Sequence, residues 1–423
     1  MQRHRVVVTG LGAVTSVGVG RQAFWNGIAA GRTGVTSIDA FDAAPFRTRI
    51  GGEIKDFKVA DIDYPDAYRL DRVCQLALFA ADEAMADSGL SDVDEDKTGV
   101  VIGTGIGGIN TIDTQQKALH SKGPRFVSPL TVPLSMFNAA AGHICIRHKL
   151  RGPTFTVSTA CSSGSNAIGE AFRLIQHGYA TSMVTGGTEA PLSYGIFSGW
   201  NALRVMSTRN GNPGEAVRPF ARDRDGLVLS EGAGVVVLEE YEHARKRGAT
   251  IYCELVGYGF NNDGFHATRP SAEGQTKAIK RALEDAELNV DDIDYINAHG
   301  TATSANDSTE THAVKAAFGD HAYKVPMSSI KSMLGHTMGA AGAIEFVAAC
   351  MTLRDGVVPP TINYHERDPN CDLDYVPNEA RDVKVKTLLS NTFGFGGCNT
   401  ILAMRSMLCK GSAAPPNPRQ PGP

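Results

Sequence analysis

The sequence predicts an α/β protein, because strand-like runs alternate with helical patterns along most of the chain. The runs are rich in β-branched residues and several end at glycine, as in RVVVTG from Arg5 and SMVTGG from Ser182. Strands that alternate with helices are typical of a mostly parallel sheet that is covered on both faces. The strand pattern is carried by residues 5–10, 98–105, 154–160, 182–187, 232–240, 251–259, 293–301 and 387–397.

The alternation of strands and helices occurs on both sides of about residue 250. We therefore predict two similar α/β halves, 1–250 with the candidate nucleophile and 251–410 with further catalytic residues, although no residue-level repeat relates them. The segment 411–423, GSAAPPNPRQPGP, has no apolar pattern and contains five prolines. It is predicted to be a disordered tail.

Composition and charge limit the class of protein. The chain has 423 residues, of which 42% are hydrophobic and 20% charged, and this indicates a folded, enzyme-sized protein. A net charge of -4 with evenly scattered Lys and Arg leaves no basic stripe, so nucleic acid is not an expected partner. Eight widely spaced cysteines without a CxxC pair predict neither a metal site nor a disulfide framework, and hence a reducing cytoplasm. No export signal and no membrane span is expected.

Cys161 lies where a strand-like run turns into a helical pattern. The run 154–160 is followed by the small residues SSG and then by NAIGEAFRLIQHG, whose apolar residues recur at helical spacing. A cysteine in such a turn faces free backbone N–H groups and the positive end of the helix dipole, which favour the thiolate over the thiol. The small neighbours permit the sharp turn that exposes a nucleophile. A buried structural cysteine is the alternative interpretation, and it is the one we adopt for the other seven cysteines.

Two histidines and a lysine accompany Cys161 as candidate catalytic groups. His299 follows the strand-like IDYINA, and ligand sites in α/β sheets lie at the carboxyl ends of strands. His336 begins the segment GHTMGAAGAIEF, and Lys331 precedes it in a mostly uncharged stretch. We expect Lys331 to pair with Glu310. Such a buried pair would fix the positions of the two side chains more than it would stabilise the fold. A lone histidine is more often a packing residue, so it is the combination of these groups that indicates catalysis.

The segment NTFGFGGCN, residues 391–399, places two phenylalanines between glycines. Its glycines give a backbone that can present N–H groups, and Phe395 is predicted to be a mobile apolar gate. A tight turn at the end of a sheet is the alternative. A second glycine-rich segment, GTGIGG at 103–108, has no clear acidic ribose partner downstream, so we expect no nicotinamide. No other cofactor and no metal is predicted.

In combination, these segments resemble the β-ketoacyl-acyl-carrier-protein synthases, most closely the type II enzymes. The resemblance rests on the motifs TACSSG, HGTAT, KSMLGH and GFGG in fixed order, and it extends from the first strand to about Arg405. It implies a thiolase-like fold of two similar halves in α-β-α-β-α layers, usually dimeric. It also implies decarboxylative Claisen condensation with malonyl on an acyl carrier protein, which gives a 3-oxoacyl product in fatty-acid or polyketide synthesis.

The resemblance implies a role for each candidate residue. Cys161 would accept the acyl group from the carrier's phosphopantetheine as a thioester. His299 and His336 would donate hydrogen bonds to the enolate oxygen that malonyl decarboxylation creates. Lys331, paired with Glu310, would orient the histidine region. The backbone N–H groups of Cys161 and Phe395 would form a second oxyanion hole. Other positions match pantetheine contacts or the acyl pocket and its gate, namely Thr301, Thr303, Ile106 and Phe395.

Two departures from the fatty-acid enzymes bear on the partners. The segment DAYRLDR, residues 66–72, mixes Asp with Arg where the family often has a basic cluster that docks the acidic carrier protein. The segment SAND, residues 304–307, lacks the proline and the Gly-Asp ending of bacterial type II synthases and is closer to type II polyketide ketosynthase subunits. The candidate carrier contacts are Arg69, Lys122, Arg125, Arg204 and Arg209.

Two condensing-enzyme interpretations stay open. One is a homodimer that elongates fatty acids, and the other is a polyketide ketosynthase subunit that pairs with a chain-length factor to make an aromatic or polyene product. A non-catalytic chain-length subunit is disfavoured because such subunits lack the nucleophile that Cys161 supplies. A thiolase is disfavoured because its late second cysteine, for which Cys398 is the only nearby candidate, is not needed beside two histidines.

Overall fold

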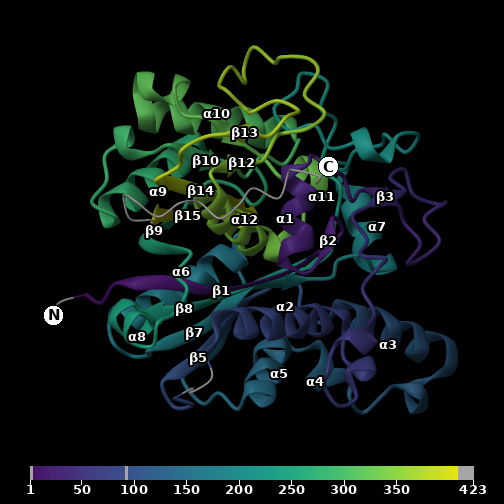
Figure 1. Cartoon of the computed structure of the whole chain (residues 1–423). Coiled ribbons are helices and arrows are strands. Elements are labelled where there is room, and N and C mark those ends of the chain that lie inside the picture. The colour runs from purple at the N-terminus through teal and green to yellow at the C-terminus, as the bar shows by residue number, and fades with distance from the viewer. Residues whose placement is uncertain (1–2, 91–93, 408–423) are drawn as a thin grey trace, which may run out of the picture.

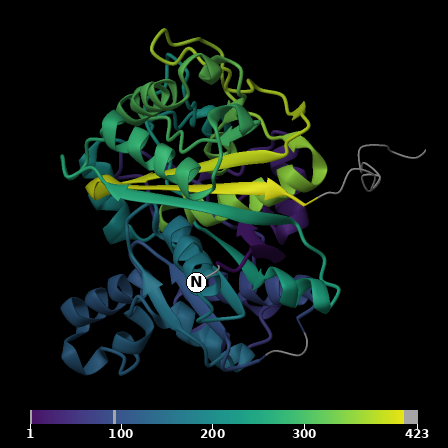
Figure 2. The ribbon, with the colours of Figure 1, turned by 90° about the vertical axis from the view of Figure 1, so that its left-hand side faces the viewer.

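The computed structural model describes residues 3–90 and 94–407, so the proline-rich segment 411–423 lies outside the described residues. A large sheet runs through the molecule (Figures 1 and 2) in the strand order β11-β10-β14-β15-β9-β1-β8-β7-β5-β6, with β2 beside β1. Its strands are β1 Val6–Thr15, β2 Gly18–Val19, β5 Thr98–Gly103, β6 Thr154–Val157, β7 Ser182–Glu189, β8 Gly232–Glu240, β9 Cys253–Asn262, β10 Tyr295–Asn297, β11 Met327–Ser328, β14 Thr387–Gly394 and β15 Cys398–Ser406. Two small pairs join β3 Thr36–Ser37 with β4 Ile50–Gly51, and β12 Val357–Val358 with β13 Arg381–Asp382.

The prediction of a mostly parallel sheet is wrong. Strands are parallel only toward the two ends of the sheet, where β5 pairs with β6 and β7, and β10 pairs with β11 and β14. The pairings between these ends are antiparallel. One physical reason is visible at β14 and β15, which are joined only by the short segment Phe395–Gly397. Such a short connection joins antiparallel neighbours, whereas parallel strands need a long crossover.

The same strand arrangement occurs on each side of the contact between β1 and β9. One set is β1, β8, β7, β5 and β6, and the other is β9, β15, β14, β10 and β11. The two sets meet through three residue pairs, Val6–Val8 with Cys253–Leu255. The matching orders give two similar halves, and the bounds 1–250 and 251–410 stay a prediction. Residue 250 falls between α8, Tyr241–Lys246, and β9.

Helices form three layers around the two sets of strands (Figure 2). The middle layer is α6, Ser163–Gln176, with α12, Ala341–Asp355, and these two helices contact each other and strands of both sets. The outer layers are α2, Arg72–Ser88, with α5, Ala139–His148, and α9, Ala272–Asp285, with α10, Ser304–Phe318. This is the expected α-β-α-β-α order. The remaining α-helices are α1 Arg21–Ala29, α3 Ile109–Lys122, α4 Thr131–Ser135, α7 Tyr194–Leu203 and α11 Lys331–Leu334.

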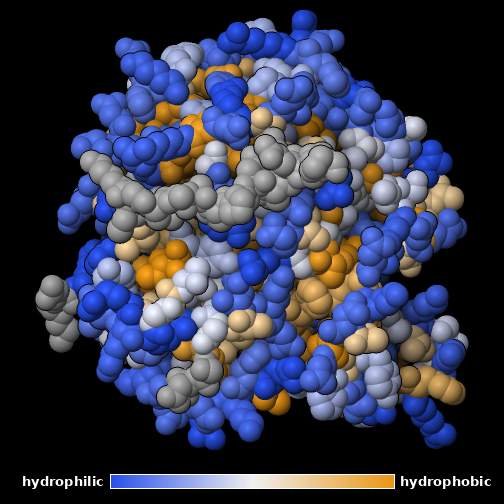
Figure 3. All heavy atoms as spheres, in the orientation of Figure 1, coloured by the Kyte–Doolittle hydropathy of each residue, from blue (hydrophilic) through white to orange (hydrophobic). Residues whose placement is uncertain are grey.

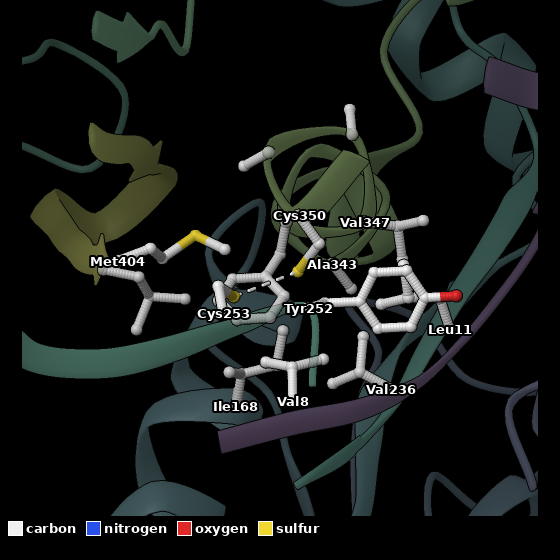
Figure 4. Packing of buried hydrophobic residues seen from close by; sticks show 14 of the residues in the cluster. Val8, Leu11, Ile168, Val236, Tyr252, Cys253, Ala343, Val347, Cys350 and Met404 are labelled. Atoms are coloured by element: carbon white, nitrogen blue, oxygen red, sulfur yellow. Dashed lines mark hydrogen bonds between the residues drawn. The ribbon is translucent and has the colours of Figure 1, made fainter. Parts of the chain in front are cut away.

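Most residues of the middle layer are buried. Figure 4 shows α12 end-on, with Val347 and Cys350 packed among apolar side chains from β1, β8, β9, β15 and α6. The sulfurs of Cys253 and Cys350 lie 3.7 Å apart in this core. Small residues bring the two helices together, because a Cβ added at Gly164 would lie only 2.9 Å from Cβ of Ala343. The starts of both helices are thereby fixed relative to each other.

The surface drawn in Figure 3 is largely hydrophilic, and hydrophobic side chains reach it in several places, including the lower right, near α3 and α4. Exposed apolar residues of this region are Phe126, Leu130, Val132, Met136 and Phe137. No helix among residues 3–90 and 94–407 is both long enough and apolar enough to span a membrane.

Candidate active site

Cys161 lies in the turn between β6 and α6, where the sequence placed it, and only 4% of its surface is exposed. The turn is strained at Ala160, whose φ of 53° is in the left-handed region that non-glycine residues rarely adopt. The glycine-rich segment packs directly against the turn, since a Cβ added at Gly394 would lie 2.8 Å from the carbonyl oxygen of Thr159. Strain and close packing together fix the direction of the Cys161 side chain.

Burial raises the pKa of the Cys161 thiol to about 11. The ammonium of Lys331 and the backbone N–H groups of Phe395 and Cys161 lower this pKa, but their effect is smaller than that of burial. The expectation that the turn favours the thiolate is therefore wrong, because a helix terminus does not offset the loss of water around the sulfur. The resting group is a thiol, and the same two N–H groups point toward it as the resemblance implied.

His299 follows β10 and is held by groups on two helices, α10 and α11. Its backbone N–H donates to Glu310 at 2.9 Å, while its carbonyl oxygen accepts from Nζ of Lys331 at 2.7 Å. The same ammonium lies 3.3 Å from Nδ1 of the ring. An ammonium only donates, so Nδ1 accepts and the ring proton is on Nε2.

His336 has the same tautomer for a different reason. The backbone N–H of Met338 donates to its Nδ1 at 3.1 Å, which again places the ring proton on Nε2. The two imidazole rings meet edge to face with centroids 5.4 Å apart, and each residue is 2% exposed. Burial, followed by the nearby charge of Lys331, holds the pKa of both rings well below the ordinary value of histidine. The site therefore contains two neutral imidazoles, each with one N–H donor.

The expected ion pair of Lys331 with Glu310 is wrong. Nζ of Lys331 pairs with Glu345 of α12. Glu310, on α10, instead accepts from the backbone N–H groups of His299 and Gly300, at 2.9 and 2.8 Å. Glu310 therefore holds the backbone of the His299 segment directly. Burial raises the pKa of each of these two carboxyls to about 7. Sequence reasoning missed Glu345. The signal that could have found it was a single Glu inside the apolar run AIEFVAAC, because a lone carboxylate in a buried helix needs a partner.

The expected gate and pocket residues lie around this group. Phe395 is half-buried, and its ring stacks on that of Trp200 of α7 with centroids 5.7 Å apart. The hydroxyls of Thr301 and Thr303 lie 2.9 Å apart at the start of α10. Ile106 follows β5, and its backbone N–H donates to Glu189 at 3.2 Å.

Trp200 and Glu189 are the two further residues that sequence reasoning missed. Glu189 is the last residue of β7 and is fully buried. Burial raises its pKa to about 7, while hydrogen bonds from Thr104, Gly105, Gly339 and Ile106 lower it. The signal in the sequence was a carboxylate that directly follows the small-residue strand end TGGT.

The five candidate carrier contacts divide into two groups. Arg209 is held by Asp223 and Asp225, at 3.2 and 3.6 Å, and Arg69 lies 3.8 Å from Asp66. The exposed cations Lys122, Arg125 and Arg204 have no acidic partner among the residues that the structure describes. Arg204 borders a hollow of about 240 Å³ that Arg47 also lines. Within the described parts of the chain, no group of three or more His, Cys, Asp or Glu residues is arranged to hold a metal ion.

Comparison with known proteins agrees with this fold. The chain matches the family models for the N-terminal domain of beta-ketoacyl synthase over residues 3–244 and its C-terminal domain over 252–365. Curated relatives include the 3-oxoacyl-[acyl-carrier-protein] synthase 2 of Synechocystis sp., 47% identical over 96% of this chain and 99% of the relative. The enzyme of the same name from Coxiella burnetii is 46% identical over the same shares.

Two solved structures extend the comparison. A type II polyketide synthase acyl-carrier protein in complex with its ketosynthase, bound to the hexaketide, aligns with a TM-score of 0.89 and 37% identity over 96% of this chain and 100% of that one. The ishigamide ketosynthase/chain length factor aligns with a TM-score of 0.91 and 34% identity, over 96% and 99%.

The fold and site define a thiolase-like condensing enzyme. More particularly, the chain belongs to the β-ketoacyl synthase family, and it is a ketosynthase, an acyltransferase that joins two acyl units by condensation.

Proposed function

We propose that this ketosynthase elongates fatty acids, with both substrates delivered on the phosphopantetheine of acyl carrier protein. The observation that carries the proposal is the pair of neutral imidazoles, His299 and His336, whose Nε2–H groups are donors in a buried site that also holds Cys161. The names of the curated relatives favour fatty-acid elongation over other pathways.

The first step is acylation of Cys161. Its sulfur attacks the carbonyl carbon of an acyl thioester, the carbon–sulfur bond to pantetheine breaks, and the proton of the Cys161 thiol leaves with the pantetheine sulfur. The backbone N–H groups of Cys161 and Phe395 hold the oxyanion of the tetrahedral intermediate. The raised pKa of the thiol, about 11, favours loss of the proton as the new bond forms over a thiolate formed beforehand.

The second step is decarboxylation of the malonyl group. The bond between its α-carbon and the carboxylate breaks, CO₂ leaves, and the electron pair becomes an enolate. His299 and His336 donate to the enolate oxygen through Nε2. Neutral donors suit this task, because a protonated imidazole would transfer its proton and quench the nucleophile. Lys331, held by Glu345, keeps the His299 ring in this tautomer.

The third step joins the two units. The enolate carbon attacks the carbonyl of the Cys161 thioester, and the resulting oxyanion lies between the same two N–H groups. Collapse of the intermediate expels the Cys161 sulfur as a thiolate, which takes up one proton from solvent, and leaves a 3-oxoacyl group on the carrier. Atoms and electrons balance across the three steps without a redox equivalent or a cofactor.

Access to the site is proposed to run past the stacked rings of Phe395 and Trp200. Movement of Phe395 would open the way to the acyl pocket beside Ile106, and the adjacent hydroxyls of Thr301 and Thr303 would bind the pantetheine arm. Lys122, Arg125 and Arg204 are the preferred contacts for the acidic carrier, because Arg69 and Arg209 lie beside carboxylates of this chain.

We propose a homodimer as the working assembly. The edge strand β6 pairs only with β5 among the described residues, and its Phe155 is 39% exposed. An unpaired edge with an apolar side chain favours addition of a further strand. A heterodimer with a chain-length factor is the second candidate, favoured by the Asn306–Asp307 form of the motif after His299 and by the ishigamide structure.

The proposal is tested by mixing the purified protein alone with malonyl carrier protein and an acyl primer on its carrier. Mass spectrometry then follows the product and the thioester on Cys161. We expect a 3-oxoacyl product from the lone protein. A thioester on Cys161 without extension would instead support the heterodimer, and absence of any thioester on Cys161 would contradict the mechanism.

A further inference from the structure

Glu189 gathers hydrogen-bond donors from two separate segments of the active site. Its carboxylate lies at the end of β7 and is fully buried. One set of donors comes from the segment after β5 and the other from the segment after His336. The donors are Oγ1 of Thr104 at 2.8 Å, the backbone N–H of Gly105 at 2.6 Å, that of Ile106 at 3.2 Å and that of Gly339 at 2.9 Å.

These two segments carry different parts of the proposed mechanism. The first contains Ile106, which lines the proposed acyl pocket. The second contains Met338, whose N–H fixes the tautomer of His336, and the next residue is Gly339. Glu189 therefore links the wall of the acyl pocket to the support of the donor that stabilises the enolate.

The packing around the carboxylate leaves little room for the two segments to move. A Cβ added at Gly339 would lie 2.4 Å from the backbone nitrogen of Gly105 and 2.5 Å from Oε2 of Glu189. A Cβ at Gly105 would lie 2.8 Å from the same oxygen. The segments thus touch through glycine backbone, and the Glu189 carboxylate accepts hydrogen bonds from both.

A contribution to stability does not explain this arrangement well. All four donors to Glu189 are neutral, and no Lys, Arg or His pairs with it among the residues described. Burial of a carboxylate without a cation is costly even when it is hydrogen-bonded. An apolar side chain would avoid this cost but would leave the four donors without an acceptor, and an amide would accept at one atom only. The two carboxylate oxygens are therefore best explained by the two segments that they hold.

We propose that Glu189 is a positioning residue of the condensation site. It fixes the position of the acyl pocket at Ile106 relative to the Nε2–H donor of His336. This inference rests on the proposed function. In Glu189→Gln, one carboxylate oxygen is replaced by an NH₂ group, which would face the N–H donors instead of accepting from them. At least one of the two segments would then lose its anchor and shift.

The experiment compares Glu189→Gln with a matched control, Glu239→Gln. Glu239 is also a fully buried carboxylate, but it lies at the opposite end of the β7–β8 ladder and is bound by Thr9, Arg247 and His243. Thr104→Val, which removes one donor hydroxyl, is a second, milder variant. For each folded variant, two rates are measured: acylation of Cys161 by primers of increasing chain length, and CO₂ release from malonyl carrier protein without a primer.

We expect Glu189→Gln to lower both rates by about tenfold or more and to change the dependence of acylation on chain length, because small misplacement of reacting groups is costly. Thr104→Val should act in the same direction with a smaller effect, and Glu239→Gln should lower the thermal midpoint while leaving both rates close to wild type.

Wild-type rates and an unchanged chain-length profile in Glu189→Gln would overturn the inference. If Glu189→Gln does not fold, an unchanged profile in Thr104→Val would overturn it equally. A wild-type protein that forms no Cys161 thioester would instead refute the proposed function.

Discussion

At the scale of single residues, one ammonium organises the site. Lys331 donates to the ring and the carbonyl of His299, pairs with Glu345, and contributes to the low pKa of both imidazoles. Its charge also acts on the Cys161 thiol, but burial outweighs it there. The result is a site in which the Cys161 nucleophile and the two imidazole donors are uncharged before substrate binds.

The role of Cys161 predicts a specific loss in Cys161→Ala. The variant should form no acyl-enzyme and no 3-oxoacyl product, because no other group can hold the acyl unit. Its stability should fall by only about 1 kcal/mol, since a small buried group is removed. Intact-protein mass spectrometry and thermal unfolding check both statements. The control is Cys398→Ala, which should still be acylated; loss of acylation there would favour a thiolase-like use of both cysteines.

The low pKa of His336 predicts how stability depends on pH. The unfolded chain binds a proton at this residue below about pH 6.5, whereas the buried ring, whose pKa is lowered, does not. Stability should therefore fall as pH decreases below 6.5, by up to about 1.4 kcal/mol per pH unit from this group. In His336→Gln that contribution is absent. Urea unfolding of both proteins at pH 7.5 and 5.5 should show a smaller acid loss in the variant, and equal losses would contradict the neutral, buried imidazole.

At the scale of elements, the turns that carry catalytic groups depend on close helix packing. The starts of α6 and α12 meet at Gly164, where an added Cβ would lie 2.9 Å from Cβ of Ala343 and 3.0 Å from the carbonyl oxygen of Gly339. Cys161 lies two residues before the start of α6, and a short 3₁₀ turn separates His336 from α12. The distance between the two helices thus sets the distance between nucleophile and donor.

This packing predicts opposite effects for two glycine substitutions in helices. Gly164→Ala should destabilise the protein by about 1–3 kcal/mol through overpacking and should slow condensation. Gly142→Ala in α5, where an added Cβ meets nothing within 4 Å, should raise stability by up to about 1 kcal/mol through helix propensity. Denaturant unfolding and product formation measure both effects. If Gly164→Ala were as stable and active as wild type, the helix spacing would not be tight.

Helices and strands were predicted best where the local sequence pattern alone determines the secondary structure. The strand before Cys161 and the helix after it follow from β-branched residues and helical spacing. The direction of β8 and β15 was missed, because strand pairing depends on contacts between residues distant in sequence. The partner of Lys331 was missed for the same reason: Glu310 and Glu345 are both acidic, and only the fold shows which one reaches the ammonium.

At the scale of the whole molecule, the exposed edge of the sheet points to self-association. A dimer through β6 should have twice the mass of the 44.9 kDa chain in solution. Phe155→Lys, which places a charge on that strand, should shift the protein toward the monomer, because charged edges disfavour strand addition. The control is Phe260→Lys on β9, a residue that is 53% exposed away from that edge. Light scattering measures the masses, and a dimer unaffected by Phe155→Lys would place the interface elsewhere.

Two similar α/β halves could be anticipated from the alternation of strands and helices on both sides of residue 250, whereas the layered order came from the resemblance to a known family. The electrostatics of the site could not, since they depend on how much water burial removes. Cys161 illustrates the limit: its turn was predicted, but burial reverses the expected effect of that turn on the thiol.

The central claim is that His299 and His336 drive decarboxylation as neutral donors, independently of the acyl-enzyme. The most direct test is CO₂ release from malonyl carrier protein by Cys161→Ala, with and without His336→Ala. We predict that Cys161→Ala still releases CO₂ and that the double variant is slower by about a hundredfold, the cost typical of losing one oxyanion donor. Equal rates in the single and double variants would contradict the account.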